Sequence, residues 1–320
     1  MIIVTGAAGF IGSCIISRLN QEGINDIIAV DVLRKNDKWK NLRHLDFYDY
    51  LDREQLLDFL QTAPKIEAII HMGACSATTE RDANYLMENN YRYTLKLAQF
   101  AITHDARFIY ASSGATYGLG EMGYDDDESK IHLLKPLNMY GYSKQLFDLK
   151  ARREGWFRNM VGLKFFNVYG PNEYFKGDMA SVVFKAFNQI QQKGFVRLFK
   201  SHRPDFKDGQ QLRDFIYVKD VLEIVLFFLK HPQKNGLFNV GTGKARSFLD
   251  LVQATFKAMD KEPKIEFFDM PENLRDRYQY FTEAKIEKLR KAGYQKEFFS
   301  LEQGITDYVQ NYLLKGMLNY

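Results

Sequence analysis

Tyr140 and Lys144 are four residues apart in the segment Tyr140-Gly-Tyr-Ser-Lys144. On a helix, this spacing places both side chains on one face, one turn apart. A phenol is a poor base near neutral pH because its pKa is about 10, and a nearby ammonium would lower that pKa. Upstream, Ser112-Ser113 offers a hydroxyl that could hold an alcohol. These residues predict a site that moves a proton on or off an alcohol while another group takes its hydride. The alternative is that Tyr140 packs and Lys144 is solvated.

A glycine-rich turn near the start of the chain predicts the hydride acceptor. Residues 2–4 are apolar, Thr5-Gly-Ala-Ala-Gly-Phe-Ile-Gly12 follows, and a helical pattern comes next. Gly6 allows a tight turn, Gly9 lets the backbone approach a pyrophosphate, and Gly12 lets helix and strand pack closely. The helix N-terminus attracts phosphates. A second apolar run ends in Asp31, 19 residues after Gly12, where a ribose-binding carboxylate is expected. A dinucleotide site is predicted; a purely structural turn is the alternative.

The elements that must position these residues alternate along the first half of the chain. Strands are predicted at 2–5, 27–31, 68–72, 107–111 and 161–166, and helices at 10–22, 52–62, 83–103 and 138–154. This alternation predicts an α/β fold with a Rossmann-type doubly wound parallel sheet, whose ligands bind beyond the carboxyl ends of the strands. The glycine turn, Asp31, Met72-Gly-Ala-Cys75 and Ser112-Ser113 all follow such ends.

The second half of the chain has a different pattern. Helices are predicted at 179–193, 219–230, 247–259, 283–291 and 300–315, and strands at 195–199, 214–218 and 237–240. The polar segment from Lys200 to Arg213 is predicted to be a surface excursion. We expect a dinucleotide-binding domain over 1–170, with parts of 214–243 returning to it. Residues 171–320 should form a smaller α/β substrate-binding region, with the substrate between the two.

Composition narrows the functional classes. The chain has 320 residues, 46% hydrophobic and 26% charged, with a net charge of +4. This mild charge argues against a nucleic-acid partner, and the lack of a long apolar run argues against a membrane partner. Two cysteines, Cys14 and Cys75, exclude a disulfide scaffold and have no metal-ligand spacing, so no metal site is expected. The first predicted strand begins at Ile2, so no signal peptide is expected and a cytoplasmic location is predicted.

Several motifs together resemble the extended short-chain dehydrogenase/reductase superfamily, and within it the ADP-L-glycero-D-manno-heptose 6-epimerase family. The resemblance runs essentially from end to end. The superfamily motifs, besides the glycine turn, Ser112-Ser113 and Tyr140–Lys144, are Phe166-Asn-Val-Tyr-Gly-Pro171, Arg213-Asp-Phe-Ile-Tyr-Val-Lys-Asp220 and Phe238-Asn-Val-Gly-Thr-Gly243. The narrower ones are His71-Met-Gly-Ala-Cys-Ser-Ala-Thr-Thr-Glu80, Met87-Glu-Asn-Asn90, Lys176-Gly-Asp-Met-Ala-Ser181 and Arg277-Tyr-Gln-Tyr-Phe-Thr282.

The resemblance implies inversion at C6 of an ADP-linked heptose, a sugar destined for lipopolysaccharide core, by a homo-oligomeric enzyme. Hydride leaves C6, a transient ketone presents its other face, and the hydride returns to a cofactor that stays bound. Such a reaction needs a proton acceptor on each side of the carbon. The resemblance assigns these roles to Tyr140 and Lys176. It also implies that Lys144 holds the nicotinamide ribose and that Ser113 hydrogen-bonds the sugar oxygen.

The choice of cofactor involves two opposed signals. Asp31 favours NAD, because a carboxylate accepts from a 2′-hydroxyl and repels a 2′-phosphate. Arg34, Lys35, Lys38 and Arg53 could neutralise that phosphate, although they could also be a solvated charge run. The resemblance implies NADP, with Lys38 and Arg53 near the phosphate, and NADP is our prediction, with NAD as the alternative. The cofactor residues expected are Gly6, Gly9, Phe10, Ile11, Gly12, Asp31, Val32, Lys38, Arg53, Met72, Gly73, Ala74, Cys75, Ser76, Asn89, Lys144, Val168 and Lys176.

Substrate contacts are also implied by position. Arg213 would suit the substrate's diphosphate; the alternative is an ion pair with Asp214 or Asp220. The chain departs from the family pattern between Lys200 and Arg213, and Asp178 stands where a small hydroxyl residue is common. The substrate residues expected are Ser113, Asn167, Asp178, Lys185, Phe199, Lys200, Ser201, Arg213 and Tyr278.

Two other functions stay open. A related hexose 4-epimerase would share Tyr140 and Lys144 but would not need Lys176. A dehydratase would want an acid pair after Ser113, where this chain has Gly114-Ala-Thr116. A non-catalytic NADP sensor on the same fold would typically lack the tyrosine or the lysine, and this chain keeps both.

Overall fold

The computed structural model describes residues 1–275 and 278–320. Arg277, the first residue of the Arg277–Thr282 motif, lies outside the described residues. The strands are β1 (Ile2–Thr5), β2 (Ile27–Asp31), β3 (Asp49–Asp52), β4 (Ala68–His71), β5 (Arg107–Ser113), β6 (Met160–Phe165), β7 (Asn167–Tyr169), β8 (Val196–Phe199), β9 (Leu212–Tyr217), β10 (Gly236–Val240), β11 (Ala245–Ser247) and β12 (Ile265–Phe268). The α-helices are α1 (Phe10–Gln21), α2 (Arg53–Thr62), α3 (Ala83–Leu86), α4 (Tyr93–Thr103), α5 (Met139–Arg153), α6 (Val182–Lys193), α7 (Val218–Lys230), α8 (Phe248–Ala258), α9 (Glu272–Arg275), α10 (Glu287–Lys291) and α11 (Leu301–Tyr308).

A seven-stranded sheet, in the order β10-β6-β5-β4-β1-β2-β3, forms the centre of the larger half. All of its strand pairs are parallel. Strand β1 lies between β4 and β2, with Ile2 opposite Ile27 of β2 and Ala68 of β4. The chain therefore has the predicted Rossmann-type sheet. Every crossover brings the next strand in with its carboxyl end at the same edge.

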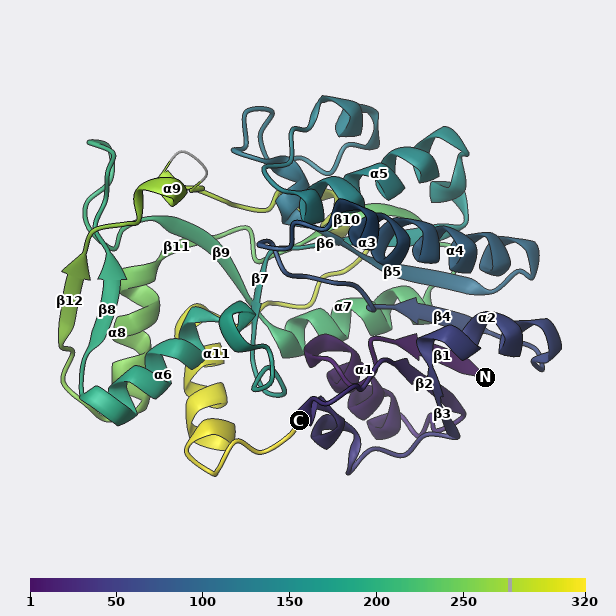
Figure 1. Cartoon of the computed structure of the whole chain (residues 1–320), viewed down its shortest axis with the longest axis horizontal. Helices are drawn as coiled ribbons and strands as arrows, with labels where there is room; N and C mark the ends of the chain where they lie inside the picture. Colours follow the sequence, from purple (N-terminus) through teal and green to yellow (C-terminus); the bar gives the residue numbers. More distant parts are fainter. Residues whose placement is uncertain (276–277) are drawn as a thin grey trace.

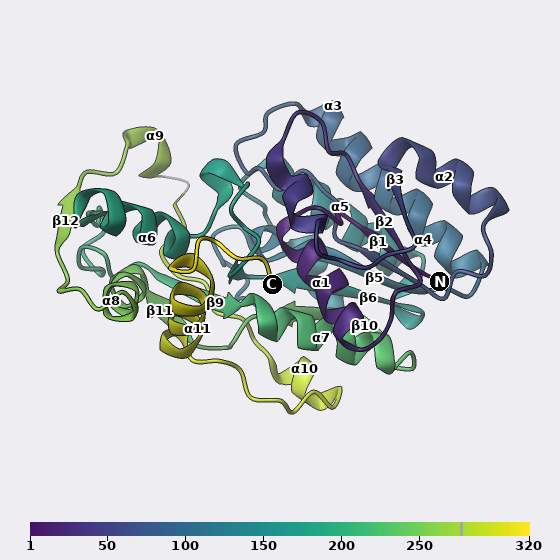
Figure 2. The same ribbon diagram turned by 90° about the horizontal axis from the view of Figure 1, so that it is seen from below.

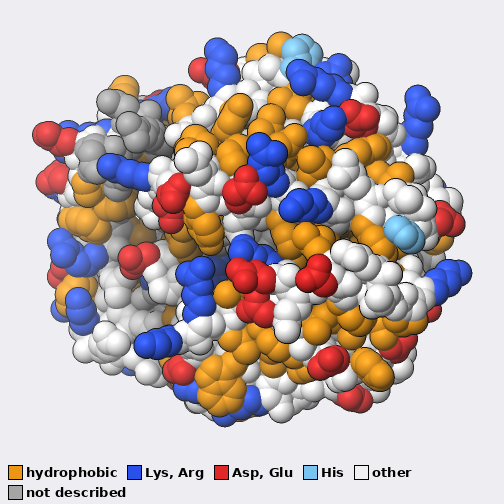
Figure 3. All heavy atoms as spheres, turned by 45° about the vertical axis from the view of Figure 1, so that its right-hand side comes forward, with side chains coloured by type: hydrophobic (Ala, Val, Ile, Leu, Met, Phe, Trp, Pro, Cys, Tyr) orange, Lys and Arg blue, Asp and Glu red, His pale blue; other side chains and the backbone are white. Residues whose placement is uncertain are grey.

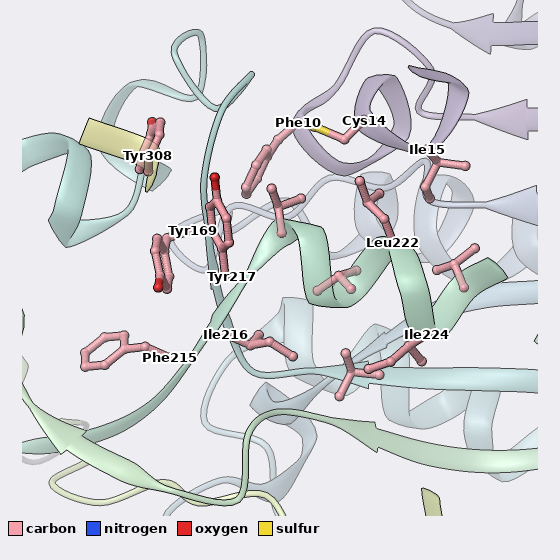
Figure 4. Packing of buried hydrophobic residues seen from close by; sticks show 14 of the residues in the cluster. Phe10, Cys14, Ile15, Tyr169, Phe215, Ile216, Tyr217, Leu222, Ile224 and Tyr308 are labelled. Atoms are coloured by element: carbon pink, nitrogen blue, oxygen red, sulfur yellow. The ribbon is translucent and has the colours of Figure 1, made fainter. Parts of the chain in front are cut away.

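Helices cover both faces of this sheet (Figures 1 and 2). One buried cluster joins the sheet to α2, α4 and α5, and the other joins it to α1 and α7. The second cluster continues into the smaller half, where Figure 4 shows Phe10 of α1, Leu222 of α7 and Tyr169 of β7 in one packed group. The two halves therefore share a core. Burial of each side chain of this size contributes about 1.5–3 kcal/mol to the stability of the fold.

The smaller half is built from short strands and three main helices. Strands β8 and β12 pair in parallel, and β9 lies between β7 and β11. Helix α8 packs against α6 and α11, at the left of Figure 1. Strand β10 then returns to the large sheet, beside β6, and α7 packs beneath it. Strand β9 does not join that sheet.

The predicted helix 83–103 is interrupted. Its middle, Met87–Arg92, is a π-helical turn between α3 and α4. The Thr94 hydroxyl donates to the Asn90 carbonyl at 2.6 Å, and Asn90 turns its amide toward the sheet edge. A π-bulge of this kind commonly marks a functional position.

Other differences are at element ends. The helix expected from 179 begins at Val182, because Ser181 caps it and residues 177–179 form a 3₁₀ turn. The helix expected at 283–291 is limited to Glu287–Lys291. Strands β3, β7, β11 and β12 were not predicted. Each has only three or four residues and lacks the continuous apolar run that marks the equally short β1 and β4.

On the face shown in Figure 3, basic and acidic side chains are interspersed among hydrophobic ones. Among residues 1–275 and 278–320, we find no helix with the length and apolar character needed to cross a bilayer.

Candidate active site

A cavity of about 530 Å³ opens beyond the carboxyl ends of β1, β4 and β5. It is lined from both halves of the molecule and brings together the four predicted catalytic residues, Ser113, Tyr140, Lys144 and Lys176. The other predicted residues that line it are Gly6, Gly9, Phe10, Ile11, Gly12, Asp31, Lys38, Met72, Gly73, Ala74, Ser76, Asn167 and Val168.

The glycine turn can accept only glycine at two positions. Gly6 has a φ of +68°, and a Cβ there would lie 2.8 Å from the Gly73 nitrogen. At Gly12 a Cβ would lie 2.0 Å from the Gly6 carbonyl oxygen, inside the helix–strand contact. Because no side chain stands at these positions, the backbone of the turn and the start of α1 line the cavity directly, which is the geometry that a pyrophosphate requires.

A second cavity, of about 220 Å³, continues from the first along the end of β2. Asp31 and Lys38 line both cavities. The Asp31 carboxylate accepts from Ala8 N at 2.8 Å, from Val32 N at 2.7 Å and from Lys38 Nζ at 2.6 Å. Since Lys38 neutralises it, Asp31 repels a phosphate less than the sequence alone suggests.

The second cavity contains the remaining predicted cofactor residues, Val32, Arg53, Cys75 and Asn89. Arg53 donates to the Asn89 side chain and lies 5.8 Å from the ring centre of Tyr93. Arg34 also lines this cavity. All eighteen predicted cofactor residues thus lie along two adjoining cavities.

At the catalytic helix, the pKa of Tyr140 is raised. Its removal from water has a larger effect than the Ser113 hydroxyl, whose hydrogen bond favours the phenolate. The expectation that the lysine lowers this pKa is therefore wrong for the chain by itself. Lys144 instead donates to the Ala111 carbonyl at 2.7 Å, and burial lowers its own pKa to about 8 against the opposing effect of Asp148.

Lys176 reaches the cavity from the segment between β7 and α6. Its ammonium lies 5.3 Å from the ring centre of Phe10, in the glycine turn. Removal from water lowers the pKa of Lys176, and Glu173 opposes that shift. A lysine with a depressed pKa can act as a base as well as an acid.

A buried polar network lies behind the catalytic serines. Asp148 is one turn after Lys144 on α5 and pairs with Lys164 of β6 at 2.8 Å. The Asp148 carboxylate also accepts from the hydroxyls of Tyr110 and Ser112, at 2.7 and 2.8 Å. This network fixes the position of α5 relative to β5 and β6.

A second network fixes the β4 edge. The His71 ring contacts Thr5 Oγ1 at 2.6 Å and Thr94 Oγ1 at 2.8 Å. Because the Thr94 hydroxyl donates to a carbonyl and the Thr5 oxygen accepts from Gly73 N at 3.1 Å, the ring accepts at Nδ1 and donates at Nε2. Burial lowers the pKa of His71 to about 3, which keeps the ring neutral.

The amide of Asn90 joins this edge to the catalytic helix. It exchanges two hydrogen bonds with the backbone of Cys75, each 2.9 Å, and donates to Ser143 Oγ at 3.1 Å. The π-helical turn therefore ties the predicted cofactor loop to α5.

Most predicted substrate residues lie outside the cavity. Only Ser113 and Asn167 line it. Asp178 uses its carbonyl to accept from Lys185 Nζ at 2.6 Å, on the exposed start of α6. Lys200 pairs loosely with Asp269, at 3.5 Å. The structure therefore does not bring these residues together at the predicted catalytic residues. Further along the smaller half lie the remaining predicted substrate residues, Phe199, Ser201, Arg213 and Tyr278.

Arg213 is 7% exposed and forms no ion pair within the described residues. The ion pairs with Asp214 or Asp220 that the sequence left open are therefore not formed. Asp214 instead accepts hydrogen bonds from Thr242 and Gly243, and Asp220 accepts one from Phe299. The guanidinium lies 5.2 Å from the ring centre of Tyr278 and 5.5 Å from that of Phe248. Burial lowers the pKa of Arg213.

Several lining residues escaped the sequence analysis, among them Thr78, Phe166, Met179 and Gln279. Thr78 follows the predicted Gly73–Ser76 stretch by two residues, so its position offered a signal. Lys164 and Asp148 also offered one, because Asp148 falls four residues after Lys144 on the same helix face. Gln279 offered one as well, because it lies within the Arg277–Thr282 motif, from which only Tyr278 was chosen as a site residue.

The comparisons with known proteins agree with this geometry. Residues 2–241 match the NAD dependent epimerase/dehydratase family. The chain belongs to this family and binds a nicotinamide dinucleotide.

Individual relatives are more specific. A protein of Nitratidesulfovibrio vulgaris (strain DP4) named ADP-L-glycero-D-manno-heptose-6-epimerase is 57% identical, over 98% of each chain. A Fusobacterium nucleatum protein of the same name is 55% identical, over 98% of each chain. The crystal structure of the Helicobacter pylori ADP-L-glycero-D-manno-heptose-6-epimerase superposes with a TM-score of 0.82, at 29% identity, covering 97% of this chain and 95% of that one.

Proposed function

We propose that this protein interconverts the two C6 epimers of ADP-glycero-manno-heptose by transient oxidation at C6. The observation that carries this proposal is the pair of acid–base groups in one cavity, Tyr140 from α5 and Lys176 from the segment after β7. Inversion at a carbinol carbon needs a proton acceptor for each epimer, on different sides of the reacting carbon. The names of the relatives supply the substrate.

Each residue has a distinct part in this mechanism. A bound nicotinamide supplies the chemistry of accepting a hydride and returning it. Tyr140 accepts the hydroxyl proton of one epimer, and Lys176 accepts that of the other. Ser113 holds the sugar oxygen between them and favours the phenolate of Tyr140 through its hydrogen bond. Lys144, whose pKa is lowered to about 8 by burial, would hold the ribose of the nicotinamide cofactor and keep a positive charge at the base of the cavity.

The residues present fit NADP. Lys38 and Arg53 line the second cavity together with Arg34, and Lys38 already neutralises Asp31. Three cations at the end of β2 suit a 2′-phosphate, which one carboxylate would otherwise repel. The mass spectrum of the dinucleotide released from purified protein tests this choice, and NAD alone in that spectrum would contradict it.

Replacing Lys176 tests the two-base mechanism. Lys176→Met should lower epimerisation by roughly 10²–10⁴-fold while the cofactor remains bound. NMR of ADP-heptose incubated with the protein measures the ratio of C6 epimers, and absorbance measures the cofactor. Lys193→Met, an exposed lysine at the end of α6, is the matched control. Full activity of Lys176→Met would remove the two-base assignment.

The other functions make different predictions in the same experiment. A hexose 4-epimerase would act on a UDP-hexose and would tolerate Lys176→Met. A non-catalytic sensor would leave the C6 ratio unchanged with the unaltered chain. We also predict a role in supplying heptose for lipopolysaccharide, a cytoplasmic location and a homo-oligomeric state. Fractionation of cells tests the location, and light scattering of the purified protein tests the oligomeric state.

A further inference from the structure

Glu173 is a buried acid in the segment that carries Lys176. It is 1% exposed, and its carboxylate accepts hydrogen bonds from both ends of that segment. Gly170 N donates at 3.3 Å, Ser181 N at 2.5 Å and Ser181 Oγ at 2.7 Å. The chain between β7 and α6 is thereby closed into a loop around one side chain.

Lys176 sits at the turn of this loop. Its backbone N–H donates to the Glu173 carbonyl at 3.1 Å, and its side chain lines the cavity above Phe10. Phe10 belongs to the packed group in Figure 4, together with Tyr308 of α11. The base of the loop is thus set in the core, and its tip bears the second acid–base group.

The charges around Glu173 single out Lys176. Cys14 of α1, Tyr174 and Tyr308 also interact with this carboxylate, but all three are neutral because burial raises their pKa values. Lys219 of α7 is also a cation, but its ammonium is paired with the Asp307 carboxylate at 2.6 Å, so its charge is already compensated.

Lys176 is the cation that favours the ionised form of Glu173, while burial raises the pKa of that acid. Conversely, Glu173 favours the ammonium form of Lys176. The two groups therefore oppose, in each other, the effect of burial.

We propose that Glu173 is a positioning residue for Lys176: it closes the 170–181 loop and places a buried negative charge in the loop that carries the ammonium. This inference rests on the proposed function, because it concerns proton transfer by Lys176. It predicts that one of the two half-reactions depends on Glu173 and the other does not.

The experiment uses the holoenzyme with oxidised cofactor. Each C6 epimer is mixed separately with the protein, and the reduced nicotinamide is followed by stopped-flow absorbance across a range of pH. Lys176→Met first identifies the epimer that depends on Lys176. If that variant affects neither epimer, the two-base function fails, and this outcome is separate from any result at Glu173.

Glu173→Gln removes the charge and keeps the shape. With the Lys176-dependent epimer, the plateau rate should fall about tenfold. The rate rises with pH as Lys176 becomes neutral, and this rise should move to lower pH, because the carboxylate no longer favours the ammonium. With the other epimer, the rate should stay within about twofold.

Ser181→Ala is the matched variant, because it keeps the charge of Glu173 while removing the hydrogen bond from Ser181 Oγ, together with the cap that this oxygen provides to Phe184 N. It should slow the Lys176-dependent epimer a few-fold without moving the pH at which the rate rises. Equal slowing of both epimers by either variant, or an unmoved pH dependence in a folded Glu173→Gln protein, would overturn the proposal. If Glu173→Gln does not fold, Ser181→Ala alone still decides between one-sided and equal slowing.

Discussion

Two buried cations lie on either side of the active site, and their surroundings differ. Lys164, in the large sheet, is 1% exposed and pairs with Asp148 at 2.8 Å while donating to Thr116 Oγ1 at 2.7 Å. Arg213, in β9 of the smaller half, is 7% exposed and has aromatic rings around it. Its one recorded hydrogen bond is donated to the neighbouring Leu212 carbonyl, at 2.8 Å.

The difference separates structure from recognition. When a buried acid lies beside a buried cation, the two charges compensate each other, and the pair holds the elements that carry them in place. A buried cation without an acid keeps most of its attraction for an anion that arrives from outside. The buried cation of the larger half is therefore compensated by the chain itself, whereas that of the smaller half is not compensated within the described residues.

The largest effect is expected at the compensated cation. Asp148→Ala would leave the Lys164 ammonium buried without its acid, and the free energy of unfolding should fall by about 3–5 kcal/mol. Denaturant unfolding measures this loss. The control in the smaller half is Asp205→Ala, which breaks the exposed Arg203–Asp205 pair and should change stability by less than about 1 kcal/mol. Equal losses in both variants would contradict the contrast between the halves.

The next effect concerns the uncompensated cation. Arg213→Met should raise the KM for ADP-heptose about tenfold to a hundredfold, since a hydrogen bond between charged groups contributes about 1.5–3 kcal/mol. Stability should not fall, because a methionine of similar volume removes an uncompensated buried charge. Lys193→Met, at an exposed lysine at the end of α6, should have little effect on KM. A large loss of stability in Arg213→Met would make Arg213 a structural residue like Lys164.

The smallest effect near neutral pH is a pH dependence of stability in the larger half, which grows only as the pH is lowered. The pKa of His71 is about 3 in the folded chain against an ordinary value of 6.5. Between these values the unfolded chain binds a proton that the folded chain does not. Stability is therefore complete above about pH 6.5 and falls as the pH is lowered toward about 3, by about 1.4 kcal/mol per pH unit.

Comparing His71→Gln with the unaltered protein by thermal unfolding across this range isolates that slope. The variant should be less dependent on pH, whereas His104→Gln, at an exposed histidine on the surface of the large half, should keep the original dependence. An unchanged slope in His71→Gln would show that the ring is not held neutral.

Much of the cofactor half could be predicted from the sequence because its signals are local. The glycine spacing, the residues at strand ends and the Tyr140–Lys144 interval each lie within one strand–turn–helix unit. A parallel sheet then brings all strand ends to one edge, and the eighteen residues predicted to bind the cofactor all line the two cavities. The assignment of Lys176 came from the resemblance, and the cavity agrees with it.

Predictions for the smaller half were less accurate. Strands as short as β7 and β11 show no alternation of polar and apolar residues in the sequence. Loops such as 200–210 are positioned by contacts with residues distant in the chain. His202 N, for example, donates to the Tyr280 hydroxyl at 3.0 Å.

The sequence by itself determined the sheet, the dinucleotide turn and the catalytic pair, since these depend on spacing along the chain. Only the tertiary structure decided which charges are compensated. Asp148 pairs with Lys164, Glu173 is buried in the loop that carries Lys176, and Arg213 pairs with no acid in the described part of the chain, although Asp214 is its neighbour in sequence. A pKa or an ion pair depends on burial and on groups brought together from separate elements, and neither is visible along the chain.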